Sequence, residues 1–171
     1  MNLNAIKMTL IITQIAIAVI TDVRCYKVKN IMIAAFLGAE IMFYAISIEH
    51  RNFFTGLLGL AAPFVVLFPL YILKMLGAGD IKLFCSIGFL VGVKDVLYSI
   101  IYSYLFGFVI AVIIMINRDN FLARFKSLFY YLKSCILSMC ILPYGGLNPQ
   151  SDGRMHFTIP IAMGTLAVIL F

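Results

Sequence analysis

The chain has 171 residues, of which 64% are hydrophobic and 12% are charged, and its mean hydropathy is +1.08. A soluble domain of this size is about half apolar and about a quarter charged. The apolar residues also form long runs, so the composition excludes a water-soluble globule and indicates an all-α membrane protein. The net charge of +6 does not indicate a nucleic-acid partner, because the basic residues stand at the ends of apolar runs.

Six apolar runs predict six transmembrane helices within a single domain, residues 1–171. The runs cover residues 3–21, 31–48, 53–73, 81–91, 96–116 and 157–171. The first run would be about 28 Å long at 1.5 Å per residue, close to the thickness of the hydrocarbon layer. Between the fifth and sixth runs, Phe129–Leu142 is interrupted by Lys133, Ser134 and Ser138. We therefore expect an interfacial amphipathic helix there, although a further span stays open.

The basic residues give the orientation of these spans. With the N-terminus outside, six spans place ten of the 13 basic residues in the cytoplasm and three outside. This is a strong positive-inside bias, which would weaken only slightly if Phe129–Leu142 also crossed. In the six-span topology Asp22 and Asp80 lie on the same, cytoplasmic face of a multi-pass protein.

Asp22 and Asp80 are the candidate catalytic residues. Two carboxylates within hydrogen-bonding range cannot both ionise easily, so one can act as general base on a water and the other as general acid. Such a pair hydrolyses a peptide bond with no metal or cofactor. Gly77 and Gly79 precede Asp80, and we expect them to adopt positive φ and to let a substrate backbone approach. The alternatives are a helix N-cap for Asp80 and a flanking acid paired with Arg24 for Asp22.

Three other polar residues are candidates for a supporting role. Lys82 either favours the ionised form of Asp80 or marks the cytoplasmic face. Asn30 either caps the second span or supports the site, and Arg24 either orients the substrate or pairs with Asp22.

Glu40 lies in the middle of the second span, where an acid is a functional candidate by default. A structural hydrogen bond is the interpretation we favour, and its role stays open. His50 and His156 are expected at opposite membrane faces, which argues against a metal site between them.

Three stretches carry a resemblance to a known family. Leu76–Lys82 resembles the GxGD motif of the type IV prepilin peptidases, which are membrane aspartic proteases. Asp22–Asn30 is similar to that family's first aspartate motif, an Asp-x-Arg followed by Ile-Pro-Asn, although the proline is missing here. Ile159–Ala162 resembles the family's closing Ile-Pro segment. The resemblance implies Asp22 and Asp80 as catalytic aspartates in the inner (plasma) membrane, acting on a prepilin-like substrate with a basic leader and an apolar helix.

Larger members of that family carry an N-terminal insertion with paired cysteines and an N-methyltransferase activity. This chain has no room for the insertion and no such cysteines, so we expect cleavage without methylation. Two other hypotheses remain open. One is a small cation- or proton-coupled transporter, which would place acids at the midplane. The other is a non-catalytic assembly factor, which would tolerate the loss of either acid.

Overall fold

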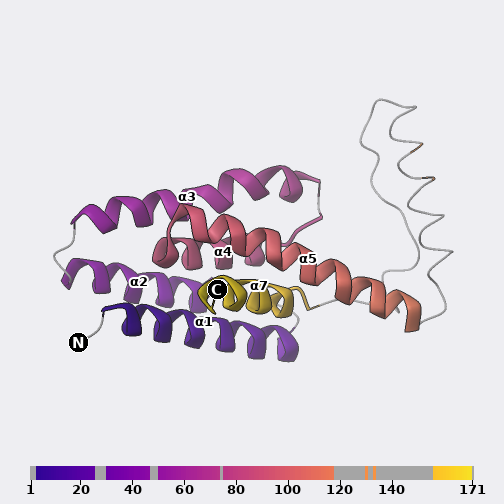
Figure 1. Ribbon diagram of the computed structural model, residues 1–171, viewed down its shortest axis with the longest axis horizontal. Helices are drawn as coiled ribbons and strands as arrows, with labels where there is room; N and C mark the ends of the chain where they lie inside the picture. The colour runs from indigo at the N-terminus through magenta and orange to yellow at the C-terminus, as the bar shows by residue number, and fades with distance from the viewer. Residues whose placement is uncertain are drawn as a thin grey trace. The chain divides into compact units, whose positions relative to one another are not determined.

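A computed structural model describes residues 3–25, 30–46, 50–73, 75–117, 130, 133 and 156–170. The regular structure in these residues is α-helical, which confirms the predicted class. The helices are α1 (Leu3–Cys25), α2 (Asn30–Ile46), α3 (His50–Ile72), α4 (Ala78–Val91), α5 (Val93–Asn117) and α7 (Thr158–Leu170) (Figure 1). The chain divides into two compact units, and the first unit comprises Met1–Gly107 with His156–Phe171. The candidate site lies within this first unit.

Three of the described helices are long and apolar enough to cross a membrane. The spans are Ala5–Cys25 in α1, Phe53–Ile72 in α3 and Val93–Ile114 in α5. Helices α2 and α7 are apolar but shorter. The total of six spans therefore stays a prediction. The predicted interfacial helix Phe129–Leu142 lies outside the described residues, apart from Tyr130 and Lys133.

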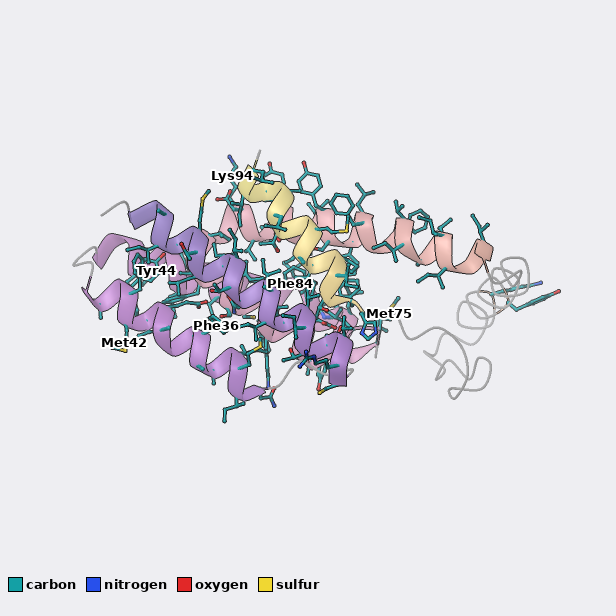
Figure 2. The ribbon with its side chains drawn as sticks, turned by 90° about the horizontal axis from the view of Figure 1, so that it is seen from below. Phe36, Met42, Tyr44, Met75, Phe84 and Lys94 are labelled. Atoms are coloured by element: carbon teal, nitrogen blue, oxygen red, sulfur yellow. The ribbon has the colours of Figure 1, made fainter. Side chains whose placement is uncertain are left out.

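The surface of the first unit carries many large apolar side chains. Phe54 and Val65 on α3 are more than half exposed, as is Ile101 on α5. Figure 2 shows the contrast with the core: Met42 and Met75 project outward, whereas Phe84 lies among the helices. A soluble protein seldom exposes so much apolar surface, but lipid tails cover it in a bilayer. The chain is therefore a membrane protein.

Helix α4 forms the centre of the first unit. It contacts α1, α2 and α3, and its buried residues include Leu83, Phe84, Ile87 and Phe89. Eight of its 14 residues are buried, so its neighbours enclose much of the helix.

Glycines allow α3 and α4 to approach closely. A Cβ atom on Gly59 would overlap the carbonyl oxygen of Gly88, and one on Gly56 would lie 2.8 Å from the carbonyl oxygen of Phe89. Gly92 is the single non-helical residue between α4 and α5, and its φ of 90° is one that residues other than glycine rarely adopt. Its N–H donates to the Gly88 carbonyl at 2.8 Å and so closes the end of α4.

Several helix boundaries differ from the sequence expectation, since α3 begins at His50 and not at residue 53, and α5 begins at Val93 and not at residue 96. Helix α1 continues one turn past Thr21, so Asp22 and Arg24 lie in its last turn and not in a connection. Helix α4 begins at Ala78, one turn before the apolar run that starts at Ile81, an extension that the sequence left open. Polar residues extend these helices beyond the apolar runs, because a helix satisfies its own backbone groups where the bilayer offers no water.

Replacing Gly59 with alanine tests the close packing of α3 on α4. The added methyl group would overlap the carbonyl oxygen of Gly88 and lie 3.0 Å from Cα of Gly92. Because backbone atoms cannot rotate away, we expect the free energy of unfolding to fall by about 1–3 kcal/mol. Gly38→Ala in α2 is the matched control, because apart from the adjacent residues and the backbone of its own helix, no described residue has a heavy atom within 4 Å of that Cβ position. This control should gain about 0.5–1 kcal/mol. Equal shifts of the two thermal midpoints in detergent would contradict the packing argument.

Candidate active site

Four helix ends meet at one end of the first unit (Figure 1). They are the C-terminal end of α1 and the N-terminal ends of α2, α4 and α7. Lys82 Nζ on α4 donates to Asn30 Oδ1 on α2 at 3.1 Å, and Thr158 on α7 donates to Asp22 on α1. These are the ends that the charge distribution assigned to the cytoplasmic side.

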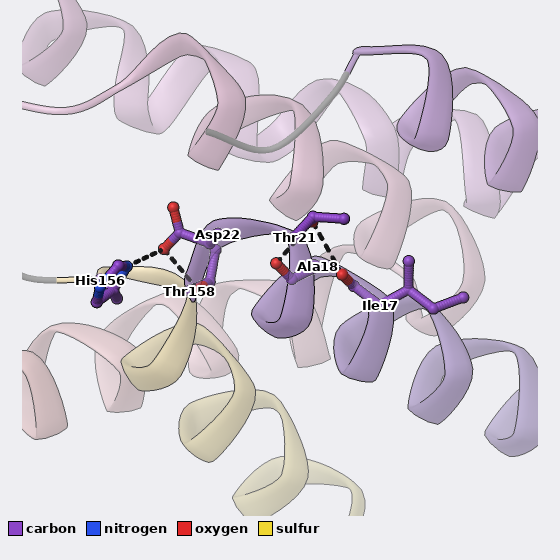
Figure 3. Close-up of polar contacts among 6 residues, drawn as sticks. All are labelled: Ile17, Ala18, Thr21, Asp22, His156 and Thr158. Carbon is purple, nitrogen blue, oxygen red and sulfur yellow. Dashed lines mark hydrogen bonds and ion pairs between the residues drawn. The ribbon is translucent and has the colours of Figure 1, made fainter. Parts of the chain in front are cut away.

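Asp22 is held by residues from the last described segment of the chain (Figure 3). Thr158 Oγ1 donates to Asp22 Oδ2 at 2.8 Å, and His156 Nδ1 lies 3.4 Å from the same oxygen. The Asp22 side chain is 13% exposed and that of His156 is 21% exposed, so both remain accessible to water. Within the described part of the chain, both contacts go to Oδ2 of Asp22.

Asp80 lies in the first turn of α4, three residues after the N-cap residue Gly77. Its carboxylate turns back and accepts a hydrogen bond from the Gly77 N–H, as the acid of a capping box does. A Cβ atom at position 77 would lie 3.1 Å from Asp80 Oδ2, so glycine leaves room for the carboxylate.

The expected positive φ at Gly77 and Gly79 is wrong. Gly77 is extended, with φ −75° and ψ 143°, and Gly79 is helical. The reason is that α4 starts at Ala78, before the predicted boundary, so Gly79 takes the conformation of the first turn. The glycines contribute space and an accessible backbone, and not an unusual turn.

The two carboxylates influence each other. The pKa of the Asp80 carboxyl is raised from 3.8 to about 6: burial is the largest cause, the negative charge of Asp22 also raises the pKa, and the hydrogen bond from Gly77 lowers it. The structure thus brings the two predicted acids, which stand on α1 and α4, within electrostatic range. Their environments also differ: Thr158 donates a hydrogen bond to Asp22, whereas burial favours the neutral form of Asp80.

The other predicted site residues have different positions. Lys82 binds Asn30 and so ties the start of α4 to the start of α2. Arg24 is exposed in the last turn of α1 and forms no hydrogen bond or ion pair with any described residue. Asp22 therefore pairs with Thr158 and His156 instead of Arg24. Among the described residues, no three His, Cys, Asp or Glu side chains form a group that could hold a metal ion.

Sequence reasoning missed Thr158 and His156. Thr158 lies 136 residues after Asp22, and neither residue belongs to a recognisable motif. The available signal was topological: the last predicted span begins on the same membrane face at which Asp22 lies.

Tyr104 on α5 was also missed. Its ring packs on Phe157 with centroids 5.4 Å apart, and Phe157 stands between His156 and Thr158. The Tyr104 hydroxyl is buried and has no hydrogen-bond partner among the described residues. The charge of Asp80 also acts on this phenol.

Comparison with known proteins identifies the family. A model described as the type IV leader peptidase family matches residues 9–112, which is more than half of the chain and includes both Asp22 and Asp80. No curated protein sequence and no solved structure matches the chain. The match favours a protease over a transporter. The chain therefore belongs to the type IV leader peptidase family.

Proposed function

We propose that the chain is a multi-pass aspartic endopeptidase of the inner (plasma) membrane that removes the basic leader from prepilin-like proteins at the cytoplasmic face. It acts as one membrane peptidase domain, with Asp22 and Asp80 as its catalytic pair and with no cofactor. The observation that carries the proposal is the family match over residues 9–112, which include both acids, and the charge of Asp22 also raises the pKa of Asp80. Arg24, exposed at the end of α1, contacts the substrate, and Lys82 and Asn30 hold α4 against α2.

The two acids take different roles in this proposal. The Asp22 carboxylate removes a proton from a water whose oxygen attacks the scissile carbonyl carbon, while neutral Asp80 donates its proton to the carbonyl oxygen. The resulting gem-diol then returns a proton to Asp80. Asp22 passes its proton to the leaving nitrogen, and the C–N bond breaks. Each cycle consumes one water and restores both acids.

Neutralising either acid should abolish cleavage. With the chain co-expressed with a prepilin-like substrate, Asp22→Asn and Asp80→Asn should each lower leader removal about a thousandfold or more, as seen on gels. Asp95→Asn is the control, because Asp95 is an exposed acid in the first turn of α5. Mass spectrometry of the product should show an unmethylated N-terminus. Cleavage that survives both site changes would exclude the pair, and an ion flux lost in the same variants would favour the transporter.

Asp80→Asn should also stabilise the protein at neutral pH. The pKa of Asp80 is about 6 in the folded chain, whereas its ordinary value is 3.8. The folded state therefore binds the proton more tightly than the unfolded state does. Proton binding to Asp80 therefore stabilises the folded state fully below pH 4, and this stabilisation is lost as the pH rises through 6. At pH 7.5 the asparagine variant, which never ionises, should be about 1–3 kcal/mol more stable than the unchanged chain.

The measurement is the thermal midpoint in detergent at pH 4 and at pH 7.5. The gain of Asp80→Asn should shrink towards pH 4. A variant that is destabilised at both pH values would show that Asp80 is kept for the fold and not for catalysis.

Thr158→Val tests the support of Asp22. The change removes the hydroxyl that donates to Asp22 Oδ2 and keeps a similar volume. We expect kcat to fall about tenfold, which corresponds to about 1.4 kcal/mol of lost positioning. Thr21→Val is the matched control, because Thr21 stands beside Asp22 and donates to the Ile17 and Ala18 carbonyls of its own helix (Figure 3). A similar loss in both variants would contradict a role specific to Thr158.

A further inference from the structure

A polar cluster lies inside the first unit, away from the candidate site. Gln14 on α1, Ser86 on α4 and Glu40 on α2 are all 0% exposed. Gln14 Nε2 donates to Ser86 Oγ at 2.6 Å, and Ser86 Oγ lies 3.0 and 3.1 Å from the two oxygens of Glu40. The cluster therefore joins three helices through one hydroxyl group.

The surroundings disfavour a charge on Glu40. Ser86 has a single proton for two carboxylate oxygens, and in the described part of the chain no basic side chain pairs with Glu40. An ionised carboxylate that is fully buried at membrane depth loses its hydration without compensation. A neutral carboxylic acid avoids this loss and adds one O–H donor.

The cluster has an acceptor that needs this donor. Gln14 Oε1 is buried and has no hydrogen-bond partner among the described residues. Rotation of the Gln14 amide exchanges its nitrogen and oxygen, so that Ser86 Oγ can donate to Gln14 Oε1 while a proton on Glu40 is donated to Ser86 Oγ. A proton on Glu40 thus both provides a hydrogen bond for Gln14 Oε1 and removes the buried charge.

The cluster also joins the two helices that carry the candidate catalytic acids. Gln14 precedes Asp22 by eight residues on α1, and Ser86 follows Asp80 by six residues on α4. The bond from Gln14 to Ser86 holds these helices together, and Glu40 orients the hydroxyl. We propose that Glu40 is a neutral carboxylic acid that acts as a positioning residue: through Ser86 and Gln14 it sets α4 against α1 and so aligns Asp22 with Asp80. The alignment rests on the proposed function, whereas the neutral state of Glu40 does not.

Infrared spectroscopy tests the neutral state without any substrate. The full chain in detergent at pH 8 should show the C=O stretching band of a protonated carboxylic acid, because Asp80, with its pKa of about 6, is then almost entirely ionised. The band should be absent from Glu40→Gln. If it is missing from the unchanged chain, or unaffected by Glu40→Gln, the proposal is overturned.

Kinetics test the positioning role. Glu40→Gln imitates the neutral acid and should keep kcat within about threefold. Glu40→Leu and Ser86→Ala should lower kcat tenfold or more and leave KM unchanged. All variants are assayed below their unfolding temperatures. Thr13→Val is the control, because Thr13 is exposed beside Gln14 and donates only within α1. Equal losses of kcat in Glu40→Gln and Glu40→Leu would overturn the proposal. A sodium requirement in the unchanged chain that Glu40→Gln abolishes would show a cation site instead.

An unchanged chain that cleaves no prepilin refutes the proposed function, and the infrared band still decides the state of Glu40.

Discussion

The length of α4 is the constraint on which the rest of the first unit depends. Its 14 residues span about 21 Å, which is shorter than the hydrocarbon layer of about 30 Å. A helix of this length leaves its ends short of the membrane surface unless longer neighbours flank it, and the close approach at Gly59 and Gly88 lets α3 pack along it. The first turn, with Asp80, consequently lies in a partly buried position. This explains why burial is the largest cause of the raised pKa of Asp80.

Polar groups connect α1 to the rest of the unit at two depths. At the end of the unit, Asp22 binds Thr158 on α7, and further inside, Gln14 binds Ser86 on α4. Both contacts join residues far apart in the chain, and both involve side chains on the helix that carries the first candidate acid. A donor or acceptor that is buried away from water is costly to leave without a hydrogen-bond partner. Each contact therefore constrains where α1 can lie. The same bonds therefore stabilise the fold and hold the site.

Much of the site was predictable because its signals are local. Asp22 and Asp80 stand at ends of apolar runs in a chain with only seven acids, and their common membrane face followed from the basic residues. The partners of Asp22 were not predictable, since Thr158 is an ordinary residue brought to Asp22 only by the packing of α7 on α1. The conformation of Gly77 was also misjudged. A glycine suits position 77 because a Cβ atom there would crowd the carboxylate of Asp80. Rules of turn composition do not consider this contact.

The separation of Asp22 from Thr158 has a consequence for the biosynthesis of the protein. Translation delivers the two aspartates early, within the first 80 residues, whereas the hydroxyl that binds Asp22 comes 136 residues after it. A nascent polypeptide that has not yet inserted α7 has both aspartates but lacks the hydrogen bond from Thr158 to Asp22. The environment of Asp22 is therefore completed only after α7 has packed against α1.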